Sequence, residues 1–285
     1  GLPASNIKNV LRTSADDIIV VSETNGAYML NDGRFNQITG LYGKTIYSSA
    51  IDRDGNLVLT TEKGLFTHKG GKFNSNISLG SKIITNIEYY QNEGWYGGIG
   101  MVYYDNGGMI KEYNLSNYSG DSKVTSIAAT ASGEAWIGTL KGLFNIKRGT
   151  ITKAKDYGKL SSNVIKSLFM DKDQNLWVGT DEGLYYNNGE KITQIKSTGD
   201  SENQIEDQKI YSINITNDRK IFIGTFGAGL FFYDPYTFRN LTNKNVFKGT
   251  TVRAISKSKN NNVWLGTDDG LVHLKGERII EGINK

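Results

Sequence analysis

A stretch repeated seven times is the feature that most constrains how this chain folds. The segment "NLWVGTDEGLYY" at 175–186 is followed near the end of the chain by the close copy "NVWLGTDDGLVHL". The further copies lie at 17–30, 56–68, 93–105, 134–146 and 220–233. The bulky residue before Gly-Thr recurs at intervals of 38, 37, 41, 41, 45 and 42, through Val20, Val58, Trp95, Trp136, Trp177, Phe222 and Trp264. Seven repeats of about 41 residues account for essentially all 285 residues.

Each repeat contains four strand-like runs separated by turn sequences. In 163–196 the runs are "VIKSLFM", "NLWVGT", "LYYN" and "KITQIK", and the turns between them contain "DKDQ", "DEG" and "NG". Asn-Gly and Asp-x-x-Gly between apolar runs are hairpin sequences, because they tolerate the positive φ that such turns require. Four antiparallel strands repeating every 40–45 residues predict an all-β fold, a β-propeller with seven four-stranded blades.

The predicted propeller is a single domain over 1–285. Its blades are expected at about 6–38, 44–78, 82–114, 122–154, 162–196, 207–241 and 249–281. The bulky residue before Gly-Thr is interpreted as a wedge against the adjacent blade. The first repeat begins with its inner strand and the last ends with its outer strand, so no strand exchange is expected. Closure would depend on packing between repeats one and seven, unless Gly1–Ser5 pairs with the last blade.

The motif W-[IVL]-G-T-x-x-G-L, preceded by D-x-x-x-N, resembles the two-component regulator propeller repeat. Residues 134–146, 175–186 and 262–274 carry the motif best. The resemblance implies the extracytoplasmic sensor domain of a Bacteroidetes-type hybrid sensor kinase, which detects a glycan fragment or another small ligand and commonly dimerises. It implies a periplasmic or extracytoplasmic location, and a fragment of a larger sensor or a stand-alone propeller. The possible partners are a ligand, a second copy, a neighbouring propeller or another protein.

Composition excludes several classes of protein. The chain has no cysteine, which excludes thiol catalysis and cysteine-based metal sites. Its 33 basic and 29 acidic residues give a net charge of +4 with no basic run, so we expect no nucleic-acid partner. No apolar segment approaches the ~20 residues needed to span a bilayer. No signal peptide precedes Gly1, which leaves a cytoplasmic protein, a mature chain or an excised domain.

Four chemical interpretations of the repeat motif are set aside. A phosphate loop needs Lys and Ser/Thr after its closing glycine, and "GTDEGLYY" has neither. "DKDQN" at 171–175 spaces its acids like a calcium loop, but Leu176 replaces the sharp-turn glycine, so a hairpin turn is favoured. Adjacent acids such as Asp181 and Glu182 are expected in a solvated loop. His68 and His273 should face opposite sides of their sheets, so catalysis by a pair of histidines is not expected.

The sequence therefore predicts no catalytic residue, no metal site and no cofactor. The leading hypothesis is a non-enzymatic ligand-sensing propeller. The first alternative is a propeller scaffold that binds a protein in a cell-envelope or secretion assembly. The second is a propeller lyase, because the streptogramin lyases resemble this chain in architecture, although no histidine here is placed to act at the central face.

A ligand is expected at the mouth of the propeller, where the fourth-to-first and second-to-third strand connections meet. Inter-repeat loops there carry Tyr42, Tyr118 and Tyr157, and Phe226 is added by the extra residue of the sixth repeat. Aromatic faces beside polar groups suit sugars or peptides. The alternative is that these rings pack on their own loops. The variable acids Asp181 and Glu182 are further candidates for ligand contacts.

The first strands of the repeats add a column of residues close to this mouth. An apolar column is followed by Lys8, Tyr47, Thr85, Thr125, Lys166, Tyr211 and Arg253. With three cations and no acid, this second column favours an anionic ligand, although a solvated rim would look the same. The third column is small, which fits a crowded axis. Of the second column, Lys8, Tyr47, Lys166, Tyr211 and Arg253 are the predicted ligand contacts.

Overall fold

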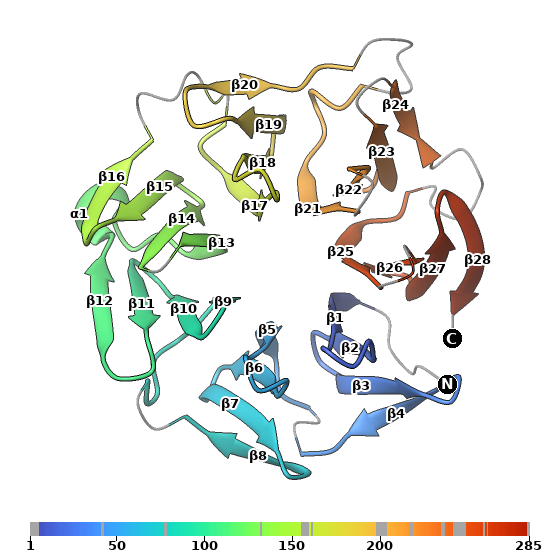
Figure 1. Cartoon of the computed structure of the whole chain (residues 1–285), viewed down its shortest axis with the longest axis horizontal. Coiled ribbons are helices and arrows are strands. Elements are labelled where there is room, and N and C mark those ends of the chain that lie inside the picture. The colour runs from blue at the N-terminus through green and yellow to red at the C-terminus, as the bar shows by residue number, and fades with distance from the viewer. Residues whose placement is uncertain are drawn as a thin grey trace. The chain divides into compact units, whose positions relative to one another are not determined.

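In the residues that it describes, the computed structural model contains 28 strands in seven sheets and one short helix. It describes residues 6–40, 43–76, 79–131, 133–154, 160, 162–197, 204–216, 219–234, 237–241, 249–258, 260 and 262–283. Every sheet has four antiparallel strands that are consecutive in the chain (Figure 1). The chain is therefore a seven-bladed β-propeller with four-stranded antiparallel blades, as the repeat predicted, and no strand is exchanged between described sheets. The assignment of 1–285 to one domain stays a prediction.

The chain divides into two compact units, and the first comprises Gly1–Lys44, Glu182–Leu184 and Ile195–Lys285. It holds three sheets. The first contains β1 (Ile7–Arg12), β2 (Ile18–Ser22), β3 (Gly26–Asn31) and β4 (Arg34–Ile38). The next contains β21 (Ile210–Ile215), β22 (Ile221–Thr225), β23 (Leu230–Asp234) and β24 (Thr237–Asn240). The last contains β25 (Val252–Lys257), β26 (Asn262–Thr267), β27 (Leu271–Lys275) and β28 (Arg278–Ile283).

The second unit comprises Thr45–Asp181 and Tyr185–Gln194 and holds the other four sheets. They begin with β5 (Ile46–Ile51), β6 (Leu57–Thr61), β7 (Gly64–Lys69) and β8 (Lys72–Ser75). There follow β9 (Asn86–Tyr90), β10 (Glu93–Gly97), β11 (Met101–Asp105), β12 (Ile110–Asn114) and the helix α1 (Ser116–Ser119). The remaining strands are β13 (Val124–Ala131), β14 (Glu134–Thr139), β15 (Gly142–Lys147), β16 (Thr150–Lys153), β17 (Ile165–Met170), β18 (Leu176–Thr180), β19 (Gly183–Asn187) and β20 (Ile192–Gln194). The first two residues of β19 belong to the first unit. Among the described residues, no helix is long and apolar enough to cross a membrane.

Gly-Thr recurs because the glycine makes room for the neighbouring sheet. A Cβ on Gly138 would lie 2.5 Å from Cγ2 of Ile165, the first apolar residue of the next sheet. A Cβ on Gly266 would lie 2.5 Å from Cγ2 of Ile7 in the first sheet. The apolar column predicted from the sequence is fully buried, at Ile7, Ile46, Ile84, Val124, Ile165, Ile210 and Val252. Within each unit, the glycine and the column residue of the next sheet therefore form a recurring contact.

The bulky residue before Gly-Thr is a wedge, as predicted. Trp264 packs in one buried cluster with Val10 and Tyr28 of the first sheet, so the first and last sheets contact each other directly. The backbone N–H of Asn6 also donates to the carbonyl of Asp268 at 3.1 Å. Packing between the first and seventh repeats is thus present, while the alternative pairing of Gly1–Ser5 lies outside the described residues.

The alignment of Val20 with Trp177 is wrong by one residue. Trp177 is paired with Phe169, and the residue paired in the same way in the first sheet is Ile19, opposite Leu11. The cause is the β2–β3 turn, which has three residues between Ser22 and Gly26. The β14–β15 turn has only two residues between its paired ends. The extra turn residue shifted the sequence alignment.

Small residues of the third column join neighbouring inner strands by hydrogen bonds. The Ser126 hydroxyl accepts a bond from the backbone N–H of Leu168 at 3.0 Å. The Ser212 hydroxyl donates to the carbonyl of Val252 at 3.1 Å. Such short side chains are required because neighbouring backbones approach closely here.

Candidate functional site

The predicted ligand column coincides with a recurring irregularity of the inner strands. Along β17, Ile165 pairs with Thr180 and Ser167 pairs with Gly179, so Lys166 is an extra residue in the ladder. The same register shift falls at Lys8, Tyr47, Thr125, Tyr211 and Arg253. A bulge redirects the side chain of its extra residue, and bulges are common beside binding sites. The column therefore has a shared backbone cause.

Three of the predicted residues come together in the first unit. The rings of Tyr211 and Phe226 stack with centroids 5.7 Å apart and an interplanar angle of 26°. The guanidinium carbon of Arg253 lies 6.0 Å from the Tyr211 centroid. Lys209 places its Nζ 5.6 Å from the Phe226 centroid. We call these four residues the Phe226 cluster; two cations flank a pair of stacked rings.

The Phe226 cluster is accessible to a ligand, since Phe226 is 52% exposed. The backbone N–H of Phe226 donates to the carbonyl of Lys209 at 3.0 Å, a bond that Asp181 makes with Val164 in the fifth repeat as well. Lys209 was not predicted. A cation directly before the first apolar column residue, Ile210, is the sequence feature that could have indicated it.

Arg253 is a cation of the cluster whose charge is available. Its Nε is buried, and no hydrogen bond or ion pair joins its guanidinium to a described residue. Nearby acids of the β26–β27 turn are engaged elsewhere. Asp268 accepts a hydrogen bond from the backbone N–H of Thr251 at 3.0 Å, and Asp269 accepts one from the Thr250 hydroxyl at 3.0 Å. A buried donor without a partner is costly, so it is a natural place for an acceptor from a ligand.

The other two predicted cations are paired with acids. Lys166 Nζ lies 3.4 Å from Asp181 Oδ1, and Lys8 Nζ lies 3.6 Å from Glu23 Oε1. Both pairs are partly buried, and they reduce the positive charge offered to a ligand. The three predicted cations are therefore not equivalent. Lys8 and Lys166 are paired with acids, whereas Arg253 is not paired with any described residue.

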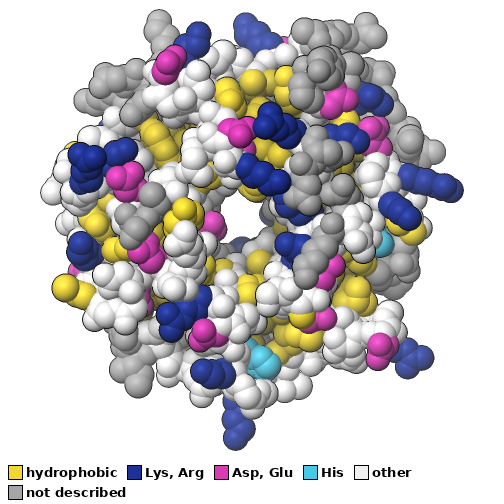
Figure 2. All heavy atoms as spheres, in the orientation of Figure 1, with side chains coloured by type: hydrophobic (Ala, Val, Ile, Leu, Met, Phe, Trp, Pro, Cys, Tyr) yellow, Lys and Arg dark blue, Asp and Glu magenta, His cyan; other side chains and the backbone are white. Residues whose placement is uncertain are grey.

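The remaining predicted contacts are not brought together by described interactions. Tyr118 lies on α1, is 47% exposed and packs edge-on against Phe144 at 6.3 Å. Tyr47 is partly buried on its bulge, and Glu182 is exposed in the β18–β19 turn. Tyr42 and Tyr157 lie outside the described residues. On the face drawn in Figure 2, basic and acidic side chains are interspersed.

The acids of "DKDQN" form a hairpin turn, as the preferred interpretation held. Asp171 Oδ1 accepts hydrogen bonds from the backbone N–H groups of Asp173 and Asn175 at 2.9 and 2.8 Å. Its Oδ2 accepts bonds from Asn175 Nδ2 at 3.1 Å and Trp177 Nε1 at 3.2 Å. Within the described residues, no group of three His, Asp or Glu side chains could hold a metal ion.

The two histidines lie on third strands and face opposite sides of their sheets, as predicted. His273 is paired with Trp264 and stacks on its indole at 3.9 Å. His68 is paired with Leu57, the residue before Val58 in the column of bulky residues, and packs against Phe73 at 4.9 Å. Each ring is therefore part of its own sheet's packing.

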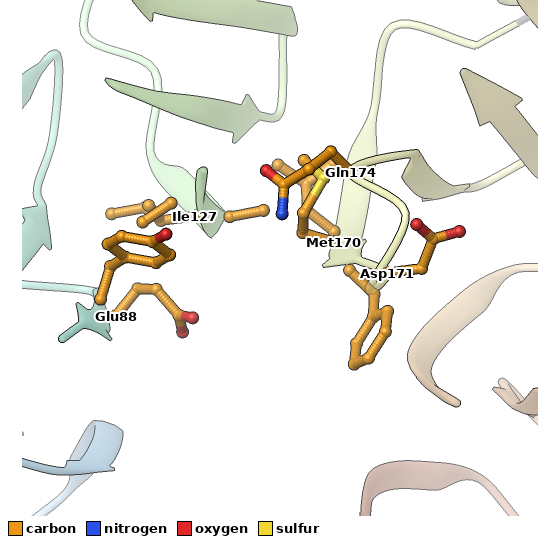
Figure 3. Close-up of a pocket in the computed structure, with 10 residues that line it drawn as sticks. Glu88, Ile127, Met170, Asp171 and Gln174 are labelled. Atoms are coloured by element: carbon orange, nitrogen blue, oxygen red, sulfur yellow. The ribbon is translucent and has the colours of Figure 1, made fainter. Parts of the chain in front are cut away.

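The structure adds a cavity that the sequence did not predict. It has a volume of about 380 Å³ and lies at the ends of the inner strands β9, β13 and β17. On β17 this is the end opposite to Lys166. Glu88 faces the cavity from β9, and burial raises the pKa of its carboxyl from 4.5 to about 8. Figure 3 shows the Glu88 and Gln174 side chains directed into the space between β9 and β17.

Comparison with known proteins bears on the repeat and on the fold. The family described as "Two component regulator propeller" matches residues 159–182, within the fifth repeat. The predicted resemblance to this repeat is therefore confirmed. No curated protein is significantly similar to the chain.

Several solved structures share the fold. The extracellular domain of BT4673 from B. thetaiotaomicron, described as a hybrid two component system, has a TM-score of 0.79 at 18% identity; the match covers 96% of this chain and 38% of that one. The extracellular domain of BT3049 from the same organism, described alike, has a TM-score of 0.77 at 18% identity, covering 96% and 39%. This chain thus spans under two fifths of either domain.

An inactive virginiamycin B lyase from Staphylococcus aureus, with Quinupristin, has a TM-score of 0.74 at 13% identity, covering 94% of each chain. At such identities the likeness establishes the fold, which sensors and lyases share.

Proposed function

We propose that this chain, which carries the two-component regulator propeller repeat, is the ligand-sensing part of an extracytoplasmic two-component sensor. Its ligand is a glycan fragment or another small molecule with an acidic group, bound at the Phe226 cluster. The observation that carries the proposal is Arg253, a partly buried cation 6.0 Å from the centroid of the Tyr211 ring, without a hydrogen-bond or ion-pair partner among the described residues.

The chemistry of the cluster supports such a ligand. Arginine binds carboxylates through two parallel hydrogen bonds, and an exposed ring such as Phe226 offers a flat surface to a sugar or an apolar face. The propeller has no catalytic role in this proposal. The ligand acts by binding one arrangement of the receptor more tightly than another, which shifts the population between them.

The similarity to the extracellular domains of BT4673 and BT3049 supports a sensor and an extracytoplasmic location. The gene tests this part. A membrane span and a histidine kinase in the same reading frame are expected. A reading frame without a kinase, among genes for a cell-envelope assembly, would instead favour the protein-binding scaffold.

The ligand site is tested by matched variants of two column residues. We expect Arg253→Ala to weaken binding of oligogalacturonate, measured by calorimetric titration, by at least tenfold. Lys166→Ala should change it less than about threefold, because Lys166 is already paired with Asp181. A neutral oligosaccharide of equal length should bind weakly to all three proteins. Equal losses in both variants, or none in Arg253→Ala, would remove the Phe226 cluster from consideration.

A further inference from the structure

The cavity beside Glu88 has the size and the walls of a small-molecule site. Its volume of about 380 Å³ falls within the roughly 300–1,000 Å³ typical of such sites. Most of the wall is apolar and comes from two inner strands, with Ile127, Ala128, Ala129, Leu168, Phe169 and Met170. All lining residues belong to the second unit, so one compact body builds the site.

The carboxyl of Glu88 has no hydrogen-bond or ion-pair partner among the described residues around this apolar cavity. No hydrogen bond or ion pair joins its carboxyl to a described residue, and no Lys or Arg is among the residues that line the cavity. The second acid, Asp171, is committed to its turn through the bonds to Asp173, Asn175 and Trp177. Figure 3 shows the Asp171 carboxylate directed away from the cavity.

We propose that this cavity binds a small organic ammonium ion, with its charged nitrogen on the Glu88 carboxylate and its apolar body against β13 and β17. An unpaired acid in an apolar pocket without a basic residue is complementary to a cation and disfavours an anion. Tyr90 and Phe169 also line the cavity, and aromatic rings attract ammonium groups. This site is built from different residues than the Phe226 cluster, and it goes beyond the proposed function.

Binding at this site is coupled to the loss of a proton. With its pKa near 8, Glu88 is mostly neutral at pH 7 in the empty protein. A bound ammonium favours the carboxylate, so the ligand displaces the Glu88 proton. The titratable groups that line the same space are Tyr90 on β9 and Asp171 in the β17–β18 turn, and β13 contributes none. Affinity should therefore fall about tenfold for each pH unit below the pKa of Glu88.

The first test uses the unmodified protein and three probes of one shape. 2-Phenylethylamine, 2-phenylethanol and phenylacetate are titrated calorimetrically at pH 8. The amine is expected to bind at least tenfold more tightly than the alcohol, and phenylacetate more weakly still. Amine binding should weaken from pH 8 to pH 6 and release a proton, detected as a dependence of the heat on the buffer.

The second test assigns the effect to Glu88. Glu88→Gln keeps the shape of the side chain and removes the charge, and it should weaken amine binding at least tenfold and abolish its pH dependence. Glu62→Gln, in the exposed β6–β7 turn, is the matched control and should leave both unchanged.

Three results would overturn the proposal. They are equal binding of amine and alcohol, tighter binding of phenylacetate, and full amine affinity in Glu88→Gln. If Glu88→Gln fails to fold, the comparison of probes and pH in the unmodified protein still decides. The outcome is separate from the oligogalacturonate titration, because the two experiments alter different side chains.

Discussion

Single atoms explain why the glycine of the repeat is required. Gly138 has ordinary backbone geometry, so its constraint is steric: an added methyl group would lie 2.5 and 3.1 Å from Cγ2 and Cβ of Ile165. We expect Gly138→Ala to lower the free energy of unfolding by about 1–3 kcal/mol, because a packed interface cannot accept the added methyl. Denaturant unfolding measures this.

The control for that substitution is Gly108→Ala. A Cβ at Gly108 would approach no atom closer than Asn106 Oδ1 at 3.7 Å, so the change should be nearly neutral. Ile165→Ala removes the colliding methyl, and its cost should be smaller in the Gly138→Ala background than alone. Additive costs would contradict the steric explanation.

Glu88 gives the stability of the molecule a dependence on pH. Its folded pKa of about 8 lies above the unfolded value of 4.5, so the folded state binds the extra proton between these limits. The stabilisation of the folded state by the neutral Glu88 carboxyl is fully present below about pH 4.5 and is lost as the pH rises through 8. We expect unfolding free energy to fall, relative to Glu88→Gln, by up to about 1.4 kcal/mol per pH unit in this window. Parallel profiles from pH 5 to 8 would refute it.

Residue identities show how far the site could be predicted. Lys8, Lys166 and Arg253 occupy equivalent bulges, and an alignment treats them alike. Yet Asp181 pairs with Lys166, while its counterpart Asp268 accepts the backbone N–H of Thr251. Whether the acid pairs with the cation or with a backbone N–H depends on the geometry of one turn, which the repeat pattern does not specify.

Glu88 could have been found by extending the column analysis by three positions beyond the bulge. The residues paired with Ile19 and with the six other bulky residues are Leu11, Ala50, Glu88, Ala128, Phe169, Asn214 and Ser256. Glu88 is the acid among them. The cavity around it could not be predicted, because its volume depends on the side-chain packing of three strands.

At the scale of elements, the repeated D-x-x-x-N turn is held by one carboxylate. Asp52 accepts backbone bonds from Asp54 and Asn56 at 3.0 and 2.8 Å, matching the bonds of Asp171 in the fifth repeat. The sequence predicted this hairpin because Asp and Asn supply acceptors and donors for their own turn. It also predicted four strands in every repeat, which the sheets confirm.

Removing that carboxylate should loosen the β17–β18 hairpin. We expect Asp171→Ala to lower the free energy of unfolding by about 1–3 kcal/mol, since several donors, among them the partly buried Trp177 Nε1, lose their acceptor. Lys172→Ala, in the same turn but exposed, should be neutral within about 0.5 kcal/mol. Indole fluorescence follows the transition, and equal effects of the two variants would argue against the turn's role.

At the scale of the whole molecule, the period of the sequence was enough to predict seven blades. The period survives changes in the loops, since a three-residue β2–β3 turn displaced the alignment of Val20 without altering the sheet. The sequence did not indicate that the chain divides into two compact units. Every repeat carries the same motif, so the motif holds no information about where contacts between repeats are denser.

The contact of Ile7 with Gly266 joins the two ends of the described chain, whereas Ile165 and Gly138 make the same contact between neighbouring repeats. Ile7→Val and Ile165→Val should lower the free energy of unfolding by similar amounts, about 0.5–1.5 kcal/mol each. The kinetics should differ, because bringing distant segments together has the larger entropic cost and occurs late. Ile7→Val should mainly accelerate unfolding, and Ile165→Val should also slow refolding, in stopped-flow chevron plots. Identical chevrons would mean that the order of assembly does not depend on distance along the chain. If the chevrons differ as expected, the contact between the first and last blades is the last to form, and its loss sets the lifetime of the folded molecule.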